Sequence, residues 1–203
     1  MRIEHHTLIS AFVSDLSPTQ CCVGYLEVQD KRAQWERLSN RARRTALDQH
    51  YFPTIIGPDD RPFIIDHHHL ALALHEVGQK TVQLMVLKRL NWLDLQTFWR
   101  LMEFHQWAHP FDQRGRRVAF TKIPATVAQL IDDPYRSLAG SARKAGAFAK
   151  DITPFSEFLW ADFFRSKIAK PILVKNWDGA VRIAVQLAGQ ADASYLPGWV
   201  GAF

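Results

Sequence analysis

The spacing of hydrophobic residues in the first half of the chain alternates between the two-residue period of a strand and the longer period of a helix. Residues 23–28, VGYLEV, have the apolar and β-favouring composition of a strand. From residue 31 to 49, apolar side chains recur every three or four positions and arginines fall on another face, which predicts an amphipathic helix. The apolar stripe of that helix consists of Trp35, Leu38, Ala42 and Ala46.

The next segment repeats the order of strand, helix and strand. Residues 54–66, TIIGPDDRPFIID, form two short β runs around a turn, because Gly, Pro and Asp supply the backbone angles that reverse a chain. Residues 68–76, HHLALALHE, are good helix formers and stop before Gly78, a typical residue just past a helix end. Residues 81–90 alternate between apolar and polar positions, which predicts a strand. Its apolar face consists of Val82, Leu84 and Val86.

After residue 91 the pattern becomes helical. Residues 94–107, DLQTFWRLMEFHQW, and residues 152–168, ITPFSEFLWADFFRSKI, each predict a helix. Helix starts are also expected near Pro124 and Pro134, since proline is tolerated in the first helical turn. In the helix predicted for residues 94–107, the side chains expected to be buried are Leu95, Phe98, Leu101, Met102 and Trp107.

These elements together predict an α+β fold, in which a small mixed sheet with flanking helices is followed by a C-terminal helical extension. We expect residues 1–90 to form the α/β core with an N-terminal extension. Residues 91–203 are expected to form the helical extension, packed on the core as one compact unit. Residues 195–203 have no helical period, and we expect this tail to pack through Trp199 and Phe203.

Composition favours a globular protein inside a reducing compartment. The chain has 203 residues, 47% of them hydrophobic, so it can bury a substantial core. No apolar run approaches the roughly 18 residues of a membrane span, and the first residues lack the pattern of a signal peptide, so we expect no membrane association and a cytoplasmic location. Cys21 and Cys22 are sequence neighbours and exclude both a disulfide framework and a four-cysteine metal site.

The charge of the chain favours an anionic partner. The formal net charge is +5, which suits a nucleotide, a nucleic acid or a phosphorylated small molecule. Basic residues concentrate in three segments, at 31–44, 114–117 and 136–150. For each segment taken alone, a solvated helix face is the more common explanation, whereas three basic segments could converge in the fold.

Residues 66–70, DHHHL, follow an apolar strand and open a helix, and we call them the histidine turn. The first backbone N–H groups of a helix have no partner within it and bind phosphate readily, so His67 to Leu70 form a candidate anion site. Asp66 suits a magnesium ion or a role in proton transfer. A dedicated transition-metal site is less convincing, because successive helical side chains point about 100° apart. A purely structural turn, in which Asp66 caps the helix, is the alternative.

The segment PTIIGPDDRPFIIDHHHLALAL resembles the signature of the ParB-like superfamily, which includes partition proteins, sulfiredoxins and free-serine kinases. In those relatives a strand ends in an Asp-Gly-His-His-Arg-like turn that opens a helix. VGYLEV, DDPYRSLAGSARKAGAF, PFSEFLWADFFR and YLPGW are similar to the ParB-like nuclease branch, so the resemblance extends over nearly the whole chain from Val23. It implies a ParB/sulfiredoxin-like fold and chemistry directed at phosphate.

The sequence departs from the superfamily pattern at two positions of the turn. His67 stands where relatives have glycine, and Leu70 stands where they have arginine, so a phosphate-binding guanidinium must come from elsewhere. We expect Arg136 or Arg143 to supply it, because a planar guanidinium suits bidentate phosphate contact. No cysteine lies in the turn, which excludes sulfiredoxin chemistry in its known form. A helix-turn-helix region is not evident either, which weakens any prediction of sequence-specific DNA binding.

Three functions follow as hypotheses. The first is a nuclease or phosphohydrolase acting on nucleic acid or a nucleotide, in which His68 or His69 moves a proton and Asp66 orients a histidine or a magnesium ion. The second is a nucleotide-dependent small-molecule kinase or nucleotide switch, by analogy with relatives. The third is a non-catalytic module that binds an anion or nucleic acid. The sequence leaves the oligomeric state open.

The predicted site residues fall into two groups. Asp66, His68, His69 and a strand-borne acid, Glu27, are the candidate catalytic residues, and Asp66 is also the candidate magnesium ligand. The candidate phosphate or ligand contacts are His67, Leu70, Tyr135, Arg136, Ser137, Arg143 and Lys144.

Overall fold

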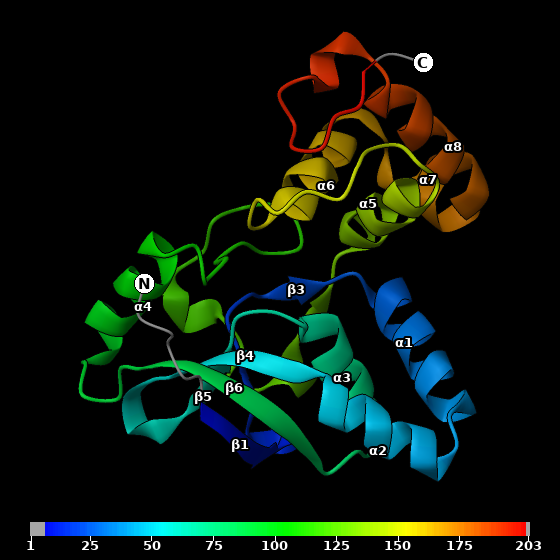
Figure 1. Ribbon diagram of the computed structural model, residues 1–203. Helices are drawn as coiled ribbons and strands as arrows, with labels where there is room; N and C mark the ends of the chain where they lie inside the picture. The colour runs from blue at the N-terminus through cyan, green and yellow to red at the C-terminus, as the bar shows by residue number, and fades with distance from the viewer. Residues whose placement is uncertain (1–6, 202–203) are drawn as a thin grey trace. The chain divides into compact units, whose positions relative to one another are not determined.

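A five-stranded mixed sheet organises the N-terminal part of the computed structural model, which describes residues 7–201 (Figure 1). The strand order is β1-β6-β4-β5-β2. The pairs β1–β6 and β4–β5 are antiparallel, whereas β4–β6 and β2–β5 are parallel. The predicted small mixed sheet is therefore confirmed. Its strands are β1 (Thr7–Phe12), β2 (Ser17–Pro18), β4 (Tyr51–Ile56), β5 (Pro62–Ile64) and β6 (Thr81–Arg89).

The chain divides into two units, and each is described by itself. The first unit runs from the described N-terminus to Cys22 and also contains Val28–Asp112 and Arg116–Ile131. The second unit contains Val23–Glu27, Gln113–Gly115 and the chain from Asp132 onward. The two-stranded pair of β3 (Cys22–Val23) with β7 (Ile131–Asp132) lies where the chain passes from one unit to the other.

The predicted hairpin, helix and strand between residues 54 and 90 are all present. β4 and β5 form an antiparallel pair, and the backbone N–H of Gly57 donates to the carbonyl of Arg61 in the turn between them. The helix α3 (His68–Glu76) ends before Gly78, whose φ of 70° is a left-handed conformation that favours glycine. On β6 the predicted apolar face of Val82, Leu84 and Val86 is buried.

The predicted strand at 23–28 is wrong, and the predicted helix at 31–49 is two helices. α1 (Tyr25–Arg37) begins within the predicted strand, and α2 (Asn40–Gln49) follows with Ser39 as its N-cap. The start of α1 is fixed by partners far away in sequence. Its first backbone N–H groups donate to the Asp132 carboxylate (2.9 Å) and the Ser137 hydroxyl (3.2 Å). These long-range caps override the local β preference of the segment.

The helix α4 (Leu95–Phe104) belongs to the first unit, with Asp94 as its N-cap. Phe98, Trp99 and Met102 are its buried residues, and the rings of Phe98 and Trp99 contact the ring of Phe63 on β5. Leu95, which we expected to be buried, is 51% exposed.

The second unit is mainly helical. α5 (Pro134–Lys144) packs against α6 (Ser156–Lys167) and α8 (Trp177–Ala188), and α7 (Lys170–Lys175) contacts α8. Trp160 and Phe164 of α6 are fully buried in its core, where the Trp160 ring stacks on Phe148. Trp199 is anchored by a hydrogen bond from its indole Nε1 to the carbonyl of Ala188 (2.9 Å). Phe203, the other predicted anchor of the tail, lies outside the described residues.

The remaining helical elements are single 3₁₀ turns. No α-helix starts at Pro124, where a 3₁₀ turn follows instead, whereas α5 does start at Pro134 as predicted. The 3₁₀ turns are η1 (Val13–Asp15), η2 (Pro58–Asp60), η3 (Phe120–Lys122), η4 (Val127–Gln129) and η5 (Ala191–Ala193).

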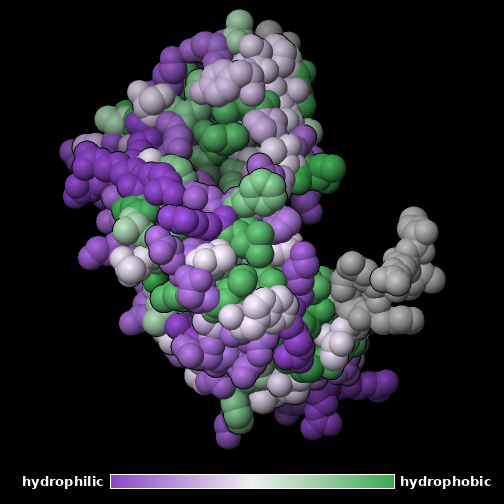
Figure 2. Space-filling view, turned by 90° about the vertical axis from the view of Figure 1, so that its left-hand side faces the viewer, coloured by the Kyte–Doolittle hydropathy of each residue, from purple (hydrophilic) through white to green (hydrophobic). Residues whose placement is uncertain are grey.

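Among residues 7–201, none of the helices combines the length and the apolar composition needed to cross a bilayer. On the face shown in Figure 2, hydrophilic and hydrophobic residues are interspersed.

The packing of α4 on the sheet predicts a contrast between two phenylalanines of the same helix. Phe98→Ala empties a fully buried site and is expected to lower the free energy of unfolding by about 3–5 kcal/mol. Phe104→Ala, at a position that is 79% exposed, is expected to change it by about 0.5 kcal/mol or less. Urea denaturation measures both, and equal losses would contradict this packing.

Candidate functional site

The histidine turn joins β5 to α3 in the first unit. Asp66 and His67 are exposed, and a carboxylate oxygen of Asp66 accepts a hydrogen bond from the backbone N–H of His67 (2.6 Å). His67 adopts a left-handed conformation with a φ of 63°. Glycine adopts this left-handed conformation at little cost. The glycine that similar turns have at the position of His67 would therefore fit the same bend. The rings of His67 and Phe52 meet in an edge-to-face arrangement, with their centroids 5.9 Å apart.

His68 points into the interior and ties the turn to a distant segment. Its Nε2 atom accepts a hydrogen bond from the backbone N–H of Thr19 (3.1 Å), and the Thr19 hydroxyl donates to the carbonyl of Ile64 (2.9 Å). Burial lowers the pKa of His68 from 6.5 to about 4, so the ring is neutral near pH 7. The buried ring holds the turn to the segment around Thr19, and its predicted part in proton transfer stays a prediction.

The other two residues of the histidine turn lie on the first turn of α3. His69 is also buried, and Leu70 is half-buried. Among the described residues, the backbone N–H groups of His68 and Leu70 donate no hydrogen bond. Unpaired N–H groups and the helix dipole favour an anion at this position.

A second group of predicted residues meets in the second unit, around Gly140 of α5. We call Glu27, Arg136, Arg143 and Glu157 the arginine–glutamate cluster. Glu157 of α6 forms ion pairs with both arginines, through its Oε2 atom with Arg136 and through its Oε1 atom with Nε of Arg143 (2.6 Å). Glu27 lies in the first turn of α1, not on a strand as predicted. Its Oε2 atom and Nη1 of Arg136 both lie within 3.9 Å of the position that a Cβ on Gly140 would occupy.

Arg136 keeps unused hydrogen-bonding capacity. Its side chain is only 10% exposed, and its Nε and Nη1 atoms are buried without a hydrogen-bond partner among the described residues. The guanidinium lies over the ring of Phe158, 5.4 Å from its centroid. Unpaired buried donors are rare and point to a missing acceptor, such as an anionic ligand or a water molecule.

The other predicted contacts on α5 have mainly structural partners. Tyr135 donates its hydroxyl to the carbonyl of Ile168 (2.7 Å), and Ser137 accepts from the backbone of α1. Both side chains are buried. Lys144 is exposed in the last turn of α5.

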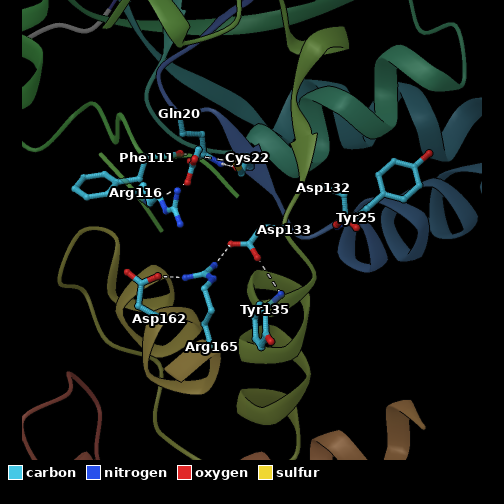
Figure 3. Close-up of polar contacts among 11 residues, drawn as sticks. Gln20, Cys22, Tyr25, Phe111, Arg116, Asp132, Asp133, Tyr135, Asp162 and Arg165 are labelled. Carbon is cyan, nitrogen blue, oxygen red and sulfur yellow. Dashed lines mark hydrogen bonds and ion pairs between the residues drawn. The ribbon is translucent and has the colours of Figure 1, made fainter. Parts of the chain in front are cut away.

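Asp133 and Arg165 are prominent polar residues that sequence reasoning missed. Figure 3 shows the Asp133 carboxylate between the guanidinium of Arg165 (2.6 Å) and the backbone N–H of Tyr135 (3.0 Å). Asp162 binds the same guanidinium from the other side. Burial raises the pKa of Asp133, and the charge of Arg165 opposes that shift. The aspartate before Pro134 was a signal for an N-cap, because proline is common in the first helical turn.

Comparison with known proteins identifies the family. A family model described as "Putative ParB-like nuclease" matches residues 9–166. The chain belongs to the ParB-like nuclease family. The resemblance seen in the sequence is thereby confirmed, and membership supports a nuclease-like role.

A solved structure of the same architecture exists. The crystal structure of protein Atu1540 from Agrobacterium tumefaciens is similar to this chain, with a TM-score of 0.90 and 40% sequence identity. The match covers 97% of this chain and 100% of that chain. The predicted α+β fold is confirmed by this likeness and by the mixed sheet. No curated protein matches the chain.

The residues of this ParB-like nuclease family member do not assemble a metal cage within the described chain. Among residues 7–201, no group of three or more His, Cys, Asp or Glu side chains could hold a metal ion. Asp66 offers one exposed carboxylate. Magnesium often uses only one or two protein carboxylates and completes its shell with phosphate oxygens and water, so the predicted magnesium ligand stays a prediction.

The burial of His68 predicts a specific pH dependence of stability. Its folded pKa of about 4 lies below the ordinary 6.5, so the stabilisation is complete above pH 6.5 and is lost as the pH falls towards 4. We expect this loss to be roughly 3 kcal/mol between pH 7 and pH 4.

Urea denaturation across this pH range tests the assignment. His68→Gln should remove that part of the pH dependence. His75→Gln, at an exposed position on the same helix, should retain it. A His68→Gln profile as steep as that of wild type would contradict the assignment.

The arginine–glutamate cluster predicts a large stability effect at Glu157. Glu157→Gln leaves Arg136, whose side chain is 10% exposed, without its ion-pair partner, and should cost about 3–5 kcal/mol of unfolding free energy. Glu103→Gln breaks the exposed pair with Arg117 and should cost about 1 kcal/mol or less. Thermal and urea denaturation of the two variants provide the comparison, and a small effect at Glu157 would contradict its role.

Proposed function

We propose that this member of the ParB-like nuclease family is a phosphohydrolase that hydrolyses a phosphate ester of a nucleic acid or a nucleotide at the histidine turn. The observation that carries the proposal is the juxtaposition of exposed Asp66 and His67 with the open N-terminus of α3. Membership of the family supports the same reaction class.

Phosphate binding is proposed to use the backbone of the turn. The N–H groups of His68 and Leu70 donate no hydrogen bond within the described chain, and a helix start attracts negative charge. The hydrogen bond from His67 N–H to Asp66 and the anchoring of His68 by Thr19 fix the backbone of this turn. A fixed turn loses little entropy when it binds an anion.

Proton transfer is proposed for His67 rather than for His68. The His67 imidazole is exposed, and an imidazole near neutral pH both accepts and donates protons. In the hydrolysis, a water oxygen forms a bond to phosphorus while the bond to the ester oxygen breaks. His67 takes the proton of the attacking water, and the departing oxygen receives a proton from the imidazolium or from solvent. Asp66 orients the turn and remains the proposed magnesium ligand.

Arg136 remains a proposed phosphate contact in the second unit. Its charge is shared with Glu157, but its two buried nitrogen atoms without partners retain the capacity to donate to an anion. Arg143 is proposed as its auxiliary, because it binds the other oxygen of the same carboxylate. Glu27 stays a proposed acid or base next to Arg136.

Cleavage assays with His67→Ala test the proposed function. The purified protein is incubated with single-stranded DNA, duplex DNA and bis(p-nitrophenyl) phosphate, each with and without Mg²⁺. Loss of a general acid or base should lower the rate of cleavage by about 100-fold or more. His75→Ala, which removes an exposed histidine from the last turn of the same helix, should cleave at the wild-type rate. Cleavage by His67→Ala at the wild-type rate would overturn the proposed role.

A further inference from the structure

A pocket with a volume of about 340 Å³ lies within the second unit. It is lined by the start of α5, by α6, by the start of α7 and by the segment Gln113–Gly115. We call it the cationic pocket. Its lining residues are Gln113, Arg114, Pro134, Tyr135, Arg165 and Lys170.

Half of this lining is positively charged. Arg114, Arg165 and Lys170 come from three separate segments of the chain, and among the described residues the lining contains no Asp or Glu. Arg114 and Lys170 are exposed, and within residues 7–201 Lys170 forms no ion pair. Three cations that converge on one cavity without a carboxylate in its wall favour an anionic ligand.

Arg165 is a rigid cation in the wall of this pocket. Asp133 and Asp162 each bind one of its terminal nitrogens, and the guanidinium lies over the ring of Tyr135, 5.1 Å from its centroid. Its Nε atom is buried without a hydrogen-bond partner among the described residues. Figure 3 shows this arrangement, in which Arg165 lies between the two carboxylates. Because the side chain is already fixed, contact with a ligand costs little additional entropy.

The two carboxylates that hold Arg165 do not cancel the charge of the pocket. Arg165, Asp133 and Asp162 together carry a formal charge of −1. The positive charge that a ligand would meet therefore comes from Lys170, which forms no ion pair within residues 7–201, and from Arg114, which also has a partner of its own. The backbone at the start of α5 offers few donors, because Pro134 has no N–H and the N–H of Tyr135 donates to Asp133. Side chains must therefore recognise the ligand.

We propose that the cationic pocket binds the phosphoryl group of a nucleotide or of a phosphorylated strand end. Phosphate has enough acceptor oxygens for Arg114, Lys170 and the amide of Gln113 together, and arginine matches its geometry. The volume lies in the range of small-molecule sites, which leaves room for an attached sugar. The proposal does not rest on catalysis at the histidine turn.

Calorimetric titration of the full chain tests the proposal. The probes are inorganic phosphate, adenosine 5′-monophosphate, adenosine, and a short single-stranded oligonucleotide with and without a 5′-phosphate. The monophosphate should bind and adenosine should not. Lys170→Gln and Arg114→Gln should each weaken the binding of the monophosphate about tenfold, as expected for the loss of one charge-assisted hydrogen bond.

Matched controls use exposed cations of the same unit that do not line the pocket. Lys175→Gln on α7 and Arg182→Gln on α8 should bind within about twofold of the wild-type affinity, as surface charges outside a site contribute little. The histidine turn is itself a proposed phosphate site, and its backbone N–H groups are unaffected by substitutions at Arg114 and Lys170. Binding that weakens in Lys170→Gln and in Arg114→Gln therefore belongs to the cationic pocket, and binding that both variants leave unchanged belongs elsewhere.

The outcomes separate the source of the phosphate. Tighter binding of the mononucleotide assigns the pocket to free nucleotides, and tighter binding of the phosphorylated oligonucleotide assigns it to strand ends. Failure of every probe to bind, or equal affinity of wild type, Lys170→Gln and Arg114→Gln, would overturn the proposal. Neither result depends on whether His67→Ala cleaves a substrate.

Discussion

The buried carboxylate of Asp133 is the constraint on which the helical unit depends. It accepts a hydrogen bond from the first turn of α5 and binds the guanidinium of Arg165 on α6. One side chain thus sets the start of one helix and connects it to the next. The cationic pocket lies at this junction, because Arg165 and Tyr135 both line it. A buried charge in this position is tolerated only because a cation and backbone donors surround it.

In the first unit, the buried ring of His68 connects the histidine turn to the segment around Thr19. Three adjacent histidines in the sequence indicate phosphate binding or proton transfer, yet in the structure His67 is exposed whereas His68 and His69 are buried. The ring of His68 is turned inward and accepts from the backbone of Thr19, whereas His67 remains exposed in a left-handed bend. The turn therefore separates a structural histidine from one that is open to solvent. Proton transfer is therefore proposed for His67, whose ring is exposed.

The helices and strands could be predicted from the sequence where their signals come from residues that are close along the chain. The hairpin around Gly57, the helix that starts at His68 and the alternation on β6 follow from turn chemistry and periodicity. The errors at residues 23–28 and around Ser39 have another cause. Tyr25 and Leu26 form a helix start because Asp132 and Ser137, more than a hundred positions later, accept from their backbone N–H groups. No window along the sequence contains that information.

The family resemblance, the α+β class and the segments that are rich in charged and polar residues can all be inferred from the amino-acid sequence. Composition, hydrophobic period and sequence motifs are properties of residues that are close along the chain, so a single sequence is enough to recognise them. Which charged groups neutralise one another depends on the tertiary structure. It paired Arg136 and Arg143 with the single carboxylate of Glu157, buried His68, and gathered Arg114, Arg165 and Lys170 around one cavity. Charge interactions act through space over a few ångströms, and distance along the chain does not specify distance in space.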